Sequence, residues 1–251
     1  RREILIQTAA RTSGRNPYYR DICRVHIDTG EFTTVLSTDH EYGVHISANS
    51  PAENAMELAE IPGSDHRVSG LAPSTNYIVT TQSRVDQVPV SLLLNRDGET
   101  LLELETADIS NLPDDWHWPE PVKITAADTD TEGEATELHG VLFRPSGFSE
   151  KNQYPVINMI VSGSWLSAVP RGSFHNSRGY VDRYYYWGAA LAELGFMVVI
   201  IDSRGTPLRD KAFQETSYGW IPDSANTADH RGAIEQLAKR YPSMDLNRVG
   251  V

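Results

Sequence analysis

The chain has 251 residues, of which 39% are hydrophobic and 22% charged, and its formal net charge is −12 at pH 7. This composition is typical of a globular protein with one large or two ordinary domains, and the negative charge argues against a general nucleic-acid binder, which needs a basic face. No apolar run approaches the ~18–20 residues of a membrane-spanning helix, so we predict no membrane span in this chain. The single cysteine, Cys23, excludes an internal disulfide, and its apolar neighbours predict a buried side chain rather than a nucleophile.

Residues 1–105 contain short strand-like segments separated by turns, without a helical pattern. Ile22–Ile27 and Phe32–Leu36 flank a turn that contains Gly30, and they predict a β-hairpin. Further strands are predicted at Ile4–Ile6, Tyr77–Thr81, Val90–Leu94 and Leu101–Leu104, and a surface excursion at residues 47–66. Strands at this spacing are typical of a sandwich, barrel or propeller, and two meander-like units at residues 18–47 and 66–104 favour propeller blades.

An acidic stretch with several prolines comes next. From Glu103 to Glu137 there are 11 acidic residues and one basic residue, and prolines occupy positions 113, 119 and 121. A charge run is usually solvated and proline breaks regular structure, so residues 106–121 are predicted to be an interdomain connection. Trp116 and Trp118 are expected to hold this connection against a domain surface.

Residues 122–251 have a different pattern. Val122–Ala126 and Thr136–Phe143 predict two antiparallel strands, and the apolar runs Tyr154–Val161 and Phe196–Ile201 predict two more. A strand that is apolar at every position is covered on both faces, which indicates the centre of a parallel sheet. A helical segment at Asp182–Leu194 separates these two runs, so the three elements predict a right-handed βαβ unit.

Two helices are predicted in this part of the chain. The first, Asp182–Leu194, is expected to end at Gly195 and to turn one face inward, made of Tyr186, Ala189, Ala190 and Leu194. The second, at residues 225–241, is expected to begin at Ser224 or Asn226 and to bury Ile234, Leu237 and Ala238. His230 in this helix is expected to be salt-bridged or to act as a cap, and the aromatic run Tyr184–Trp187 to pack in the core and at an interface. A fifth strand is predicted at Val249.

Two antiparallel strands followed by strand, helix, strand, helix and strand is the order in which an α/β-hydrolase begins. In that fold the nucleophile lies in a Gly-x-Ser-x-Gly turn directly after strand five. No such pentapeptide occurs in the 251 residues. We therefore expect the chain to stop at the entrance to that turn.

Several separate stretches resemble the prolyl oligopeptidase family of serine peptidases, in particular its dipeptidyl peptidase IV branch and bacterial relatives. They are Asn16–Arg20, Thr80–Val90, Gly140–Pro145, Tyr154–Val156, Asp202–Phe213, Tyr218–Gly219 and Met244–Val251. The resemblance implies the end of an N-terminal β-propeller in residues 1–105, a connection at 106–121, and the N-terminal half of an α/β-hydrolase domain in residues 122–251.

The resemblance also implies the activity, which is cleavage of short peptides near their N-terminus through an acyl-enzyme and a Ser-Asp-His triad. All three triad residues are expected after Val251, so this chain alone is expected to be inactive. A peptide substrate, a homodimer and an exported or periplasmic location are implied in the same way. No cofactor, metal or nucleic acid is expected.

One family feature is different in this chain. Members of the branch carry a tyrosine after strand three whose hydroxyl donates to the oxyanion, but the matching positions here are Val161, Ser162, Gly163 and Ser164. Because valine has no donor, either a serine or a backbone N–H substitutes, or the substrate class or the activity differs. The alternatives are therefore an esterase or acyl hydrolase of the same fold, and a catalytically inactive propeller–hydrolase protein that binds a partner.

Asp202 and Arg204 follow strand four, at the end of a strand where an α/β sheet commonly binds its substrate. We expect both to be structural residues near the site, because an arginine fork is suited to tying loop carbonyls and carboxylates together. The alternative is that Arg204, Arg209 and Lys211 attract a peptide carboxylate.

Overall fold

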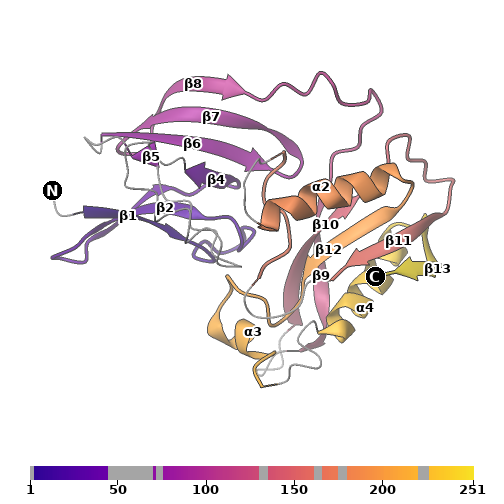
Figure 1. Cartoon of the computed structure of the whole chain (residues 1–251). Helices are drawn as coiled ribbons and strands as arrows, with labels where there is room; N and C mark the ends of the chain where they lie inside the picture. The colour runs from indigo at the N-terminus through magenta and orange to yellow at the C-terminus, as the bar shows by residue number, and fades with distance from the viewer. Residues whose placement is uncertain are drawn as a thin grey trace. The chain divides into compact units, whose positions relative to one another are not determined.

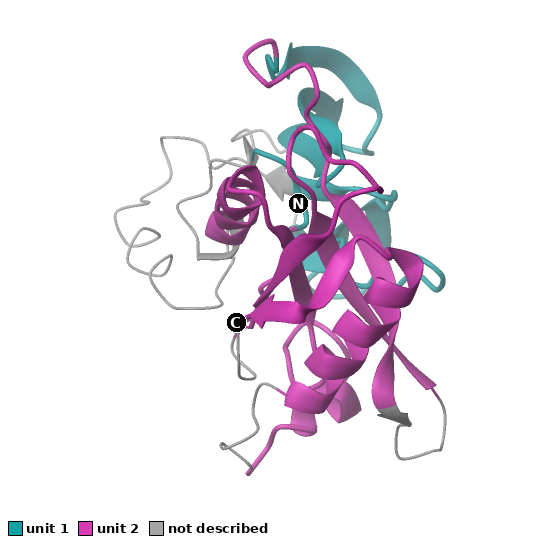
Figure 2. Cartoon of the chain, turned by 90° about the vertical axis from the view of Figure 1, so that its right-hand side faces the viewer, with its two compact units in different colours: residues 1–109, 171–179 teal, residues 110–170, 180–251 magenta. Residues whose placement is uncertain are grey.

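The computed structural model describes residues 3–44, 70–71, 76–129, 135–160, 166–174, 180–219 and 226–251. The chain divides into two compact units (Figure 2). Unit 1 contains residues 1–109 and 171–179, and unit 2 contains residues 110–170 and 180–251. The backbone therefore passes from one unit to the other at three places.

Unit 1 is built from antiparallel strands (Figure 1). One sheet has the order β1-β2-β3, formed by Glu3–Thr8, Asp21–His26 and Phe32–Leu36. The second has the order β4-β6-β7-β8, formed by Glu41–Val44, Tyr77–Arg84, Gln87–Asn95 and Thr100–Thr106, and β5, Gly70–Leu71, pairs with β6. Residues 47–66, where a surface excursion is predicted, lie outside the described residues.

The predicted hairpin is confirmed, since β2 and β3 pair antiparallel with Val25 opposite Phe32, and Gly30 has the positive φ of +70° that the turn needs. The prediction that residues 18–47 form one meander is wrong. β4 leaves the first sheet and pairs with β6, because Tyr42 packs with Ile78 in the core of unit 1. Cys23 is fully buried, as predicted.

Unit 2 contains a five-stranded mixed sheet in the order β13-β11-β12-β10-β9. Its strands are Glu120–Thr129 (β9), Ala135–Phe143 (β10), Tyr154–Met159 (β11), Met197–Asp202 (β12) and Met244–Gly250 (β13). The predicted antiparallel pair is confirmed in β9 and β10, and the predicted parallel pair in β11 and β12. β12 is the central strand, as predicted, but the sheet is parallel on only one side of it. β12 runs parallel to β11 and antiparallel to its other neighbour, β10.

Two helices cover opposite faces of this sheet, α2 (Tyr180–Glu193) and α4 (Thr227–Arg240) (Figures 1 and 2). Every residue of β12 is buried, as expected for a strand that is covered on both sides. Met197, Val199 and Ile201 belong to the same core cluster as three α4 residues, Ala233, Ile234 and Leu237.

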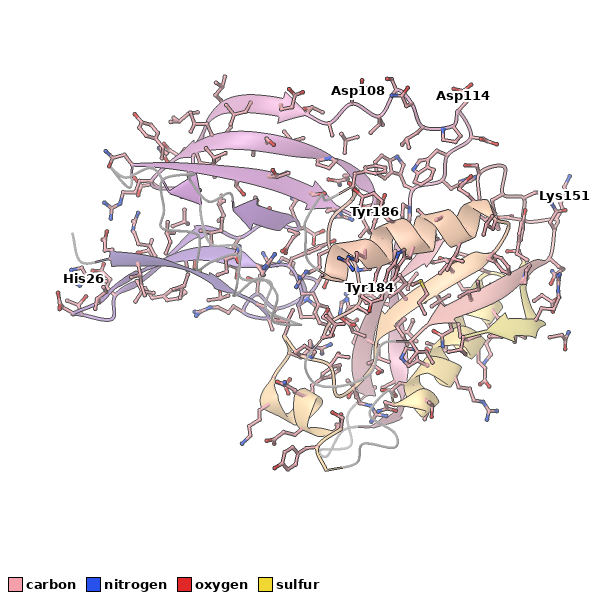
Figure 3. All side chains as sticks on the ribbon, viewed as in Figure 1. His26, Asp108, Asp114, Lys151, Tyr184 and Tyr186 are labelled. Atoms are coloured by element: carbon pink, nitrogen blue, oxygen red, sulfur yellow. The ribbon has the colours of Figure 1, made fainter. Side chains whose placement is uncertain are left out.

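The inward face predicted for α2 is wrong. Tyr186 is 45% exposed and Leu194 is 74% exposed, whereas Tyr184 and Tyr185 are buried. Figure 3 labels Tyr184 and Tyr186 at this helix. Tyr185 packs edge to face against Phe143 of β10, at 5.7 Å between ring centroids. The aromatic run allows either of two faces of this helix to turn inward. The large Phe143 ring favours the face that carries Gly188, because glycine leaves room for the ring.

The ends of both helices follow the predicted chemistry. Gly195 follows α2 with a φ of +95° and donates to the Ala192 carbonyl, and Asn226 caps α4 by accepting from the Asp229 N–H. A short helix, α3 (Lys211–Glu215), lies between β12 and α4, where the sequence analysis predicts no helix. No helix among the described residues is long and apolar enough to cross a membrane.

Candidate functional site

The candidate site lies at the carboxyl ends of β11 and β12. These strands run parallel, with Val156 opposite Met197 and Met159 opposite Ile200, so their carboxyl ends reach the same edge of the sheet. In open α/β sheets, ligands bind outside this edge. Asp202 is the last residue of β12 and therefore lies at the edge where a substrate is expected.

The four candidates for the oxyanion-binding loop, Val161, Ser162, Gly163 and Ser164, lie outside the described residues. Their role stays a prediction. The described chain continues from Leu166, and the residues from Leu166 to Pro170 are all buried although they form no helix or strand.

Asp202 binds this buried segment with both carboxylate oxygens. Its Oδ2 accepts a hydrogen bond from the Ser167 hydroxyl at 2.5 Å. Its Oδ1 accepts from the backbone N–H groups of Ala168 at 2.8 Å and Val169 at 3.4 Å. The side chain is fully buried, so these contacts replace the water that a carboxylate would otherwise need.

Arg204 binds Asp229 of α4 in a two-pronged ion pair. The guanidinium Nε and Nη2 donate to the two carboxylate oxygens at 2.9 and 2.8 Å. The same carboxylate accepts from the backbone N–H of Arg204 at 3.1 Å and of Ala127 at 3.0 Å. Asp229 thus ties three parts of unit 2 together: the loop after β12, strand β9 and the first turn of α4.

The loop after β12 turns sharply at Gly205. Its φ is +100°, and a Cβ at this position would lie 2.7 Å from the Cβ of Ser217, so only glycine fits without a shift. The Gly205 N–H donates to the carbonyl of Phe213 in α3. α3 is preceded by Asp210, whose side chain accepts from the Phe213 N–H. This N-cap is the signal by which sequence reasoning could have found α3.

The three basic residues proposed as a carboxylate-binding set have protein partners. Arg204 pairs with Asp229. Arg209 donates to the Glu137 carbonyl at 2.9 Å and lies over the Phe213 ring. Lys211 lies 3.5 Å from Glu215 in an exposed pair.

Two histidines of unit 2 are buried, and each has a polar neighbour. His230 Nδ1 lies 3.2 Å from the Asn158 amide oxygen of β11, so the predicted salt bridge or cap is wrong. His139 Nε2 lies 2.9 Å from Glu137 Oε1. Burial lowers the pKa of each ring to about 4 from its ordinary value of 6.5. Both rings are therefore neutral and weakly basic at pH 7, which makes neither of them a good general base.

These contacts make a rigid support rather than a complete reaction centre. At the carboxyl edge of the sheet, Asp202 fixes the loop after β11 and Asp229 fixes the loop after β12. Within the described part of the chain, no group of three or more His, Cys, Asp or Glu side chains could hold a metal ion.

No family model matches the chain. Human dipeptidyl peptidase 8 is 31% identical over 114 residues, which are 45% of this chain and 12% of the human protein. The mouse dipeptidyl peptidase 8 is 30% identical over 114 residues, again 45% of this chain and 12% of that protein. The chain therefore matches only a small part of these curated relatives.

Two solved structures share the fold over nearly the whole chain. A candidate dipeptidyl aminopeptidase IV from Bacteroides ovatus matches 100% of this chain and 30% of its own, with a TM-score of 0.67 and 21% identity. Dipeptidyl peptidase 4 from Porphyromonas gingivalis matches 99% of this chain and 29% of its own, with a TM-score of 0.62 and 19% identity. The resemblance expected from the sequence is thus confirmed: the curated proteins that match this chain are dipeptidyl peptidases, and the two solved structures that share its fold bear the names of a dipeptidyl aminopeptidase IV and a dipeptidyl peptidase 4.

Proposed function

We propose that this chain is part of a serine peptidase that releases dipeptides from the N-terminus of short peptides. The observation that carries the proposal is the sheet order β13-β11-β12-β10-β9, with β11, β12 and β13 parallel and an antiparallel pair at the other end. This order supports the proposal that β9 to β13 are the first five strands of an α/β-hydrolase sheet. The matched relatives add the reaction class, since they are dipeptidyl peptidases.

Unit 1 supports a propeller as the second part of the proposed enzyme. Its sheet β4-β6-β7-β8 is antiparallel throughout, as a four-stranded propeller blade is. The sheet β1-β2-β3 would supply strands of the neighbouring blade.

In the proposed reaction, a serine on the turn after β13 attacks the scissile carbonyl and forms an acyl-enzyme, which water then hydrolyses. The developing oxyanion needs donors, and each good donor is worth about 3–4 kcal/mol of transition-state stabilisation. We propose that residues 161–164 supply one of these donors through a serine hydroxyl or a backbone N–H. Asp202 and Arg204 are support residues in this scheme.

The experiment compares the 251-residue chain with the longer protein proposed to contain it. Both are incubated with a fluorophosphonate probe and with a fluorogenic Xaa-Pro dipeptide amide. We expect labelling and dipeptide release by the longer protein, and neither by the 251-residue chain, because it contains no Gly-x-Ser-x-Gly turn. Turnover by the short chain above a heat-inactivated sample would contradict this proposal.

A panel of substrates separates the peptidase from the two alternatives. The Val161 position motivates an esterase or acyl hydrolase, which would cleave acyl esters in preference to dipeptide amides. A partner-binding protein without activity would not react with the fluorophosphonate probe. Either result would replace the dipeptidyl peptidase proposal.

A further inference from the structure

We propose that Asp202 is a positioning residue of the active centre, which fixes the backbone of Ser167–Val169 at the carboxyl edge of the sheet. The structural half of this inference rests on the contacts of Asp202. The catalytic half rests on the proposed function, because it requires that the reaction occur at this edge.

The segment that Asp202 holds is unusual for a loop. All residues from Leu166 to Pro170 are buried, yet they belong to no helix or strand that could satisfy their backbone groups. The Asp202 carboxylate provides hydrogen-bond acceptors for some of these groups. It accepts from the N–H groups of Ala168 and Val169 and from the Ser167 hydroxyl. Hydrogen bonds to an ionised acceptor are about twice as strong as neutral ones, so this anchor is well suited to a loop without a ladder of its own.

The anchor is attached to the most constrained part of the sheet. Asp202 is paired with His139 of β10, and the residues before it are paired with β11. Both faces of β12 are covered, and all of its residues are buried. A rigid strand end that binds a loop through a side chain is the arrangement by which supporting residues hold a reactive geometry within about 0.5 Å.

Asp229 provides a matched comparison for Asp202. It is also a fully buried carboxylate that accepts from two backbone N–H groups, those of Arg204 and Ala127. Its partners lie in the loop after β12 and in β9, whereas those of Asp202 lie in the loop after β11. Replacing either aspartate by asparagine therefore neutralises a buried acceptor of backbone N–H groups in a different loop, and at Asp229 it also removes the charge that pairs with Arg204.

The first experiment measures amide hydrogen exchange in the 251-residue chain. In Asp202→Asn, the amides of Ala168 and Val169 should exchange about tenfold faster, because a charged acceptor becomes neutral. The amides of Ala127 and Arg204 should be unchanged. Asp229→Asn should give the opposite pattern. Unchanged exchange of Ala168 in Asp202→Asn would overturn the structural half of the proposal.

A second variant covers the case in which Asp202→Asn does not fold. Ser167→Ala removes a single donor and leaves the carboxylate in place, so it should fold. It should increase the exchange of Ala168 by less than tenfold, because both backbone hydrogen bonds of that carboxylate remain. If Ser167→Ala left the exchange at Ala168 and Val169 unaltered, the carboxylate network would not hold this segment.

The second experiment measures kinetics in the longer protein, with active enzyme counted by fluorophosphonate titration. Asp202→Asn should lower kcat by about 10- to 100-fold, as a small misplacement of reacting groups does, with KM changed less than about threefold. The control is Glu235→Gln, which neutralises an exposed carboxylate of α4 and should keep the wild-type kcat per titrated site. Equal kcat values in the two variants would overturn the positioning role. Absence of activity in the wild-type protein would instead refute the proposed function, and the exchange result would still stand.

Discussion

The ion pair of Arg204 and Asp229 is enclosed by unit 2. The Asp229 side chain is completely buried and that of Arg204 is 10% exposed. Such a pair does not guarantee stability compared with a hydrophobic alternative, but removal of one partner leaves a buried charge without compensation. The effect of the pair on stability is therefore measured by a substitution that removes only one of its two partners.

We predict that Asp229→Ala lowers the free energy of unfolding of unit 2 by about 3–5 kcal/mol. Glu235→Ala in the same helix is the control. It removes the exposed partner of Arg231 and should cost less than about 1 kcal/mol. Urea unfolding followed by tryptophan fluorescence would measure both. A cost below 1 kcal/mol for Asp229→Ala would show that the pair is not a support of the fold.

The buried histidines predict a pH dependence of stability. The pKa of His139 and of His230 is about 4 in the folded protein, compared with 6.5 without burial. As the pH falls from 6.5 to 4, the unfolded chain takes up these protons and the folded protein does not. Each histidine should therefore reduce the stability of unit 2 by about 1.4 kcal/mol per pH unit in this window.

Urea titrations at pH 7, 6 and 5 would test this dependence, and His230→Asn should reduce the slope by the contribution of one proton. Above pH 6.5 both histidines are neutral in the folded and in the unfolded chain. The free energy of unfolding should therefore not change with pH there because of these two residues. A slope that is identical in His230→Asn and in the wild-type chain would contradict the assignment.

At the level of elements, helix α2 depends on a glycine. A Cβ on Gly188 would lie 2.8 Å from Cε2 of the buried Phe143 ring. In α4, a Cβ on Gly232 would meet nothing closer than 3.8 Å. The same substitution in two helix interiors should therefore have opposite effects.

We predict that Gly232→Ala stabilises unit 2 by about 0.5–1 kcal/mol, the gain in helix propensity. Gly188→Ala gains the same propensity but forces the Phe143 ring to move, which typically costs about 1–3 kcal/mol, so the net effect should be a loss. Thermal unfolding of both variants gives the comparison. If Gly188→Ala raised the midpoint temperature as Gly232→Ala does, the packing of α2 on Phe143 would be wrong.

The elements that the sequence predicts well are those with a local signal. β12 is recognisable because its residues before Asp202 are all apolar, and the β2–β3 hairpin because a glycine turn separates two alternating segments. The inward face of α2 depends on Phe143, which is distant in sequence, and the pairing of β4 with β6 crosses an intervening stretch of chain. Neither partner can be derived from local periodicity.

The candidate site shows the same limit. The position of Asp202 at a strand end can be predicted, because a parallel strand ends there. Its partners Ser167–Val169 cannot, since they are 33 to 35 residues away and have no distinctive sequence. Asp229, the partner of Arg204, was likewise not recognisable among the polar residues of α4.

At the level of the whole molecule, the two units are interleaved along the chain. The connection from β11 to α2 contains residues 171–179, which belong to unit 1. The Ser173 N–H donates to the Ser83 hydroxyl at 3.0 Å, and the Ser173 hydroxyl donates to the Gln87 carbonyl. Arg171 is 6% exposed, and its Nε lies 3.9 Å from Glu41.

We predict that a single cut in the connection at residues 110–114 leaves the two pieces associated, because residues 171–174 of the second piece complete unit 1. A protease site placed there, followed by size-exclusion chromatography, would test this. Arg171→Glu places two buried carboxylates together and should weaken the association. Immediate separation of the cut wild-type chain would contradict the interleaved arrangement.

The place of Arg171 in unit 1 also has a consequence for protein engineering. A shortened gene that begins at Ser110 would encode the whole sheet of unit 2. It would also encode Arg171 and Ser173, whose partners Glu41 and Ser83 would be absent. Such a product should expose that stretch to proteases. Grafting a short loop in place of residues 171–179 should remove the problem, which makes the β11–α2 connection, rather than residue 110, the place to redesign when unit 2 is to be produced alone.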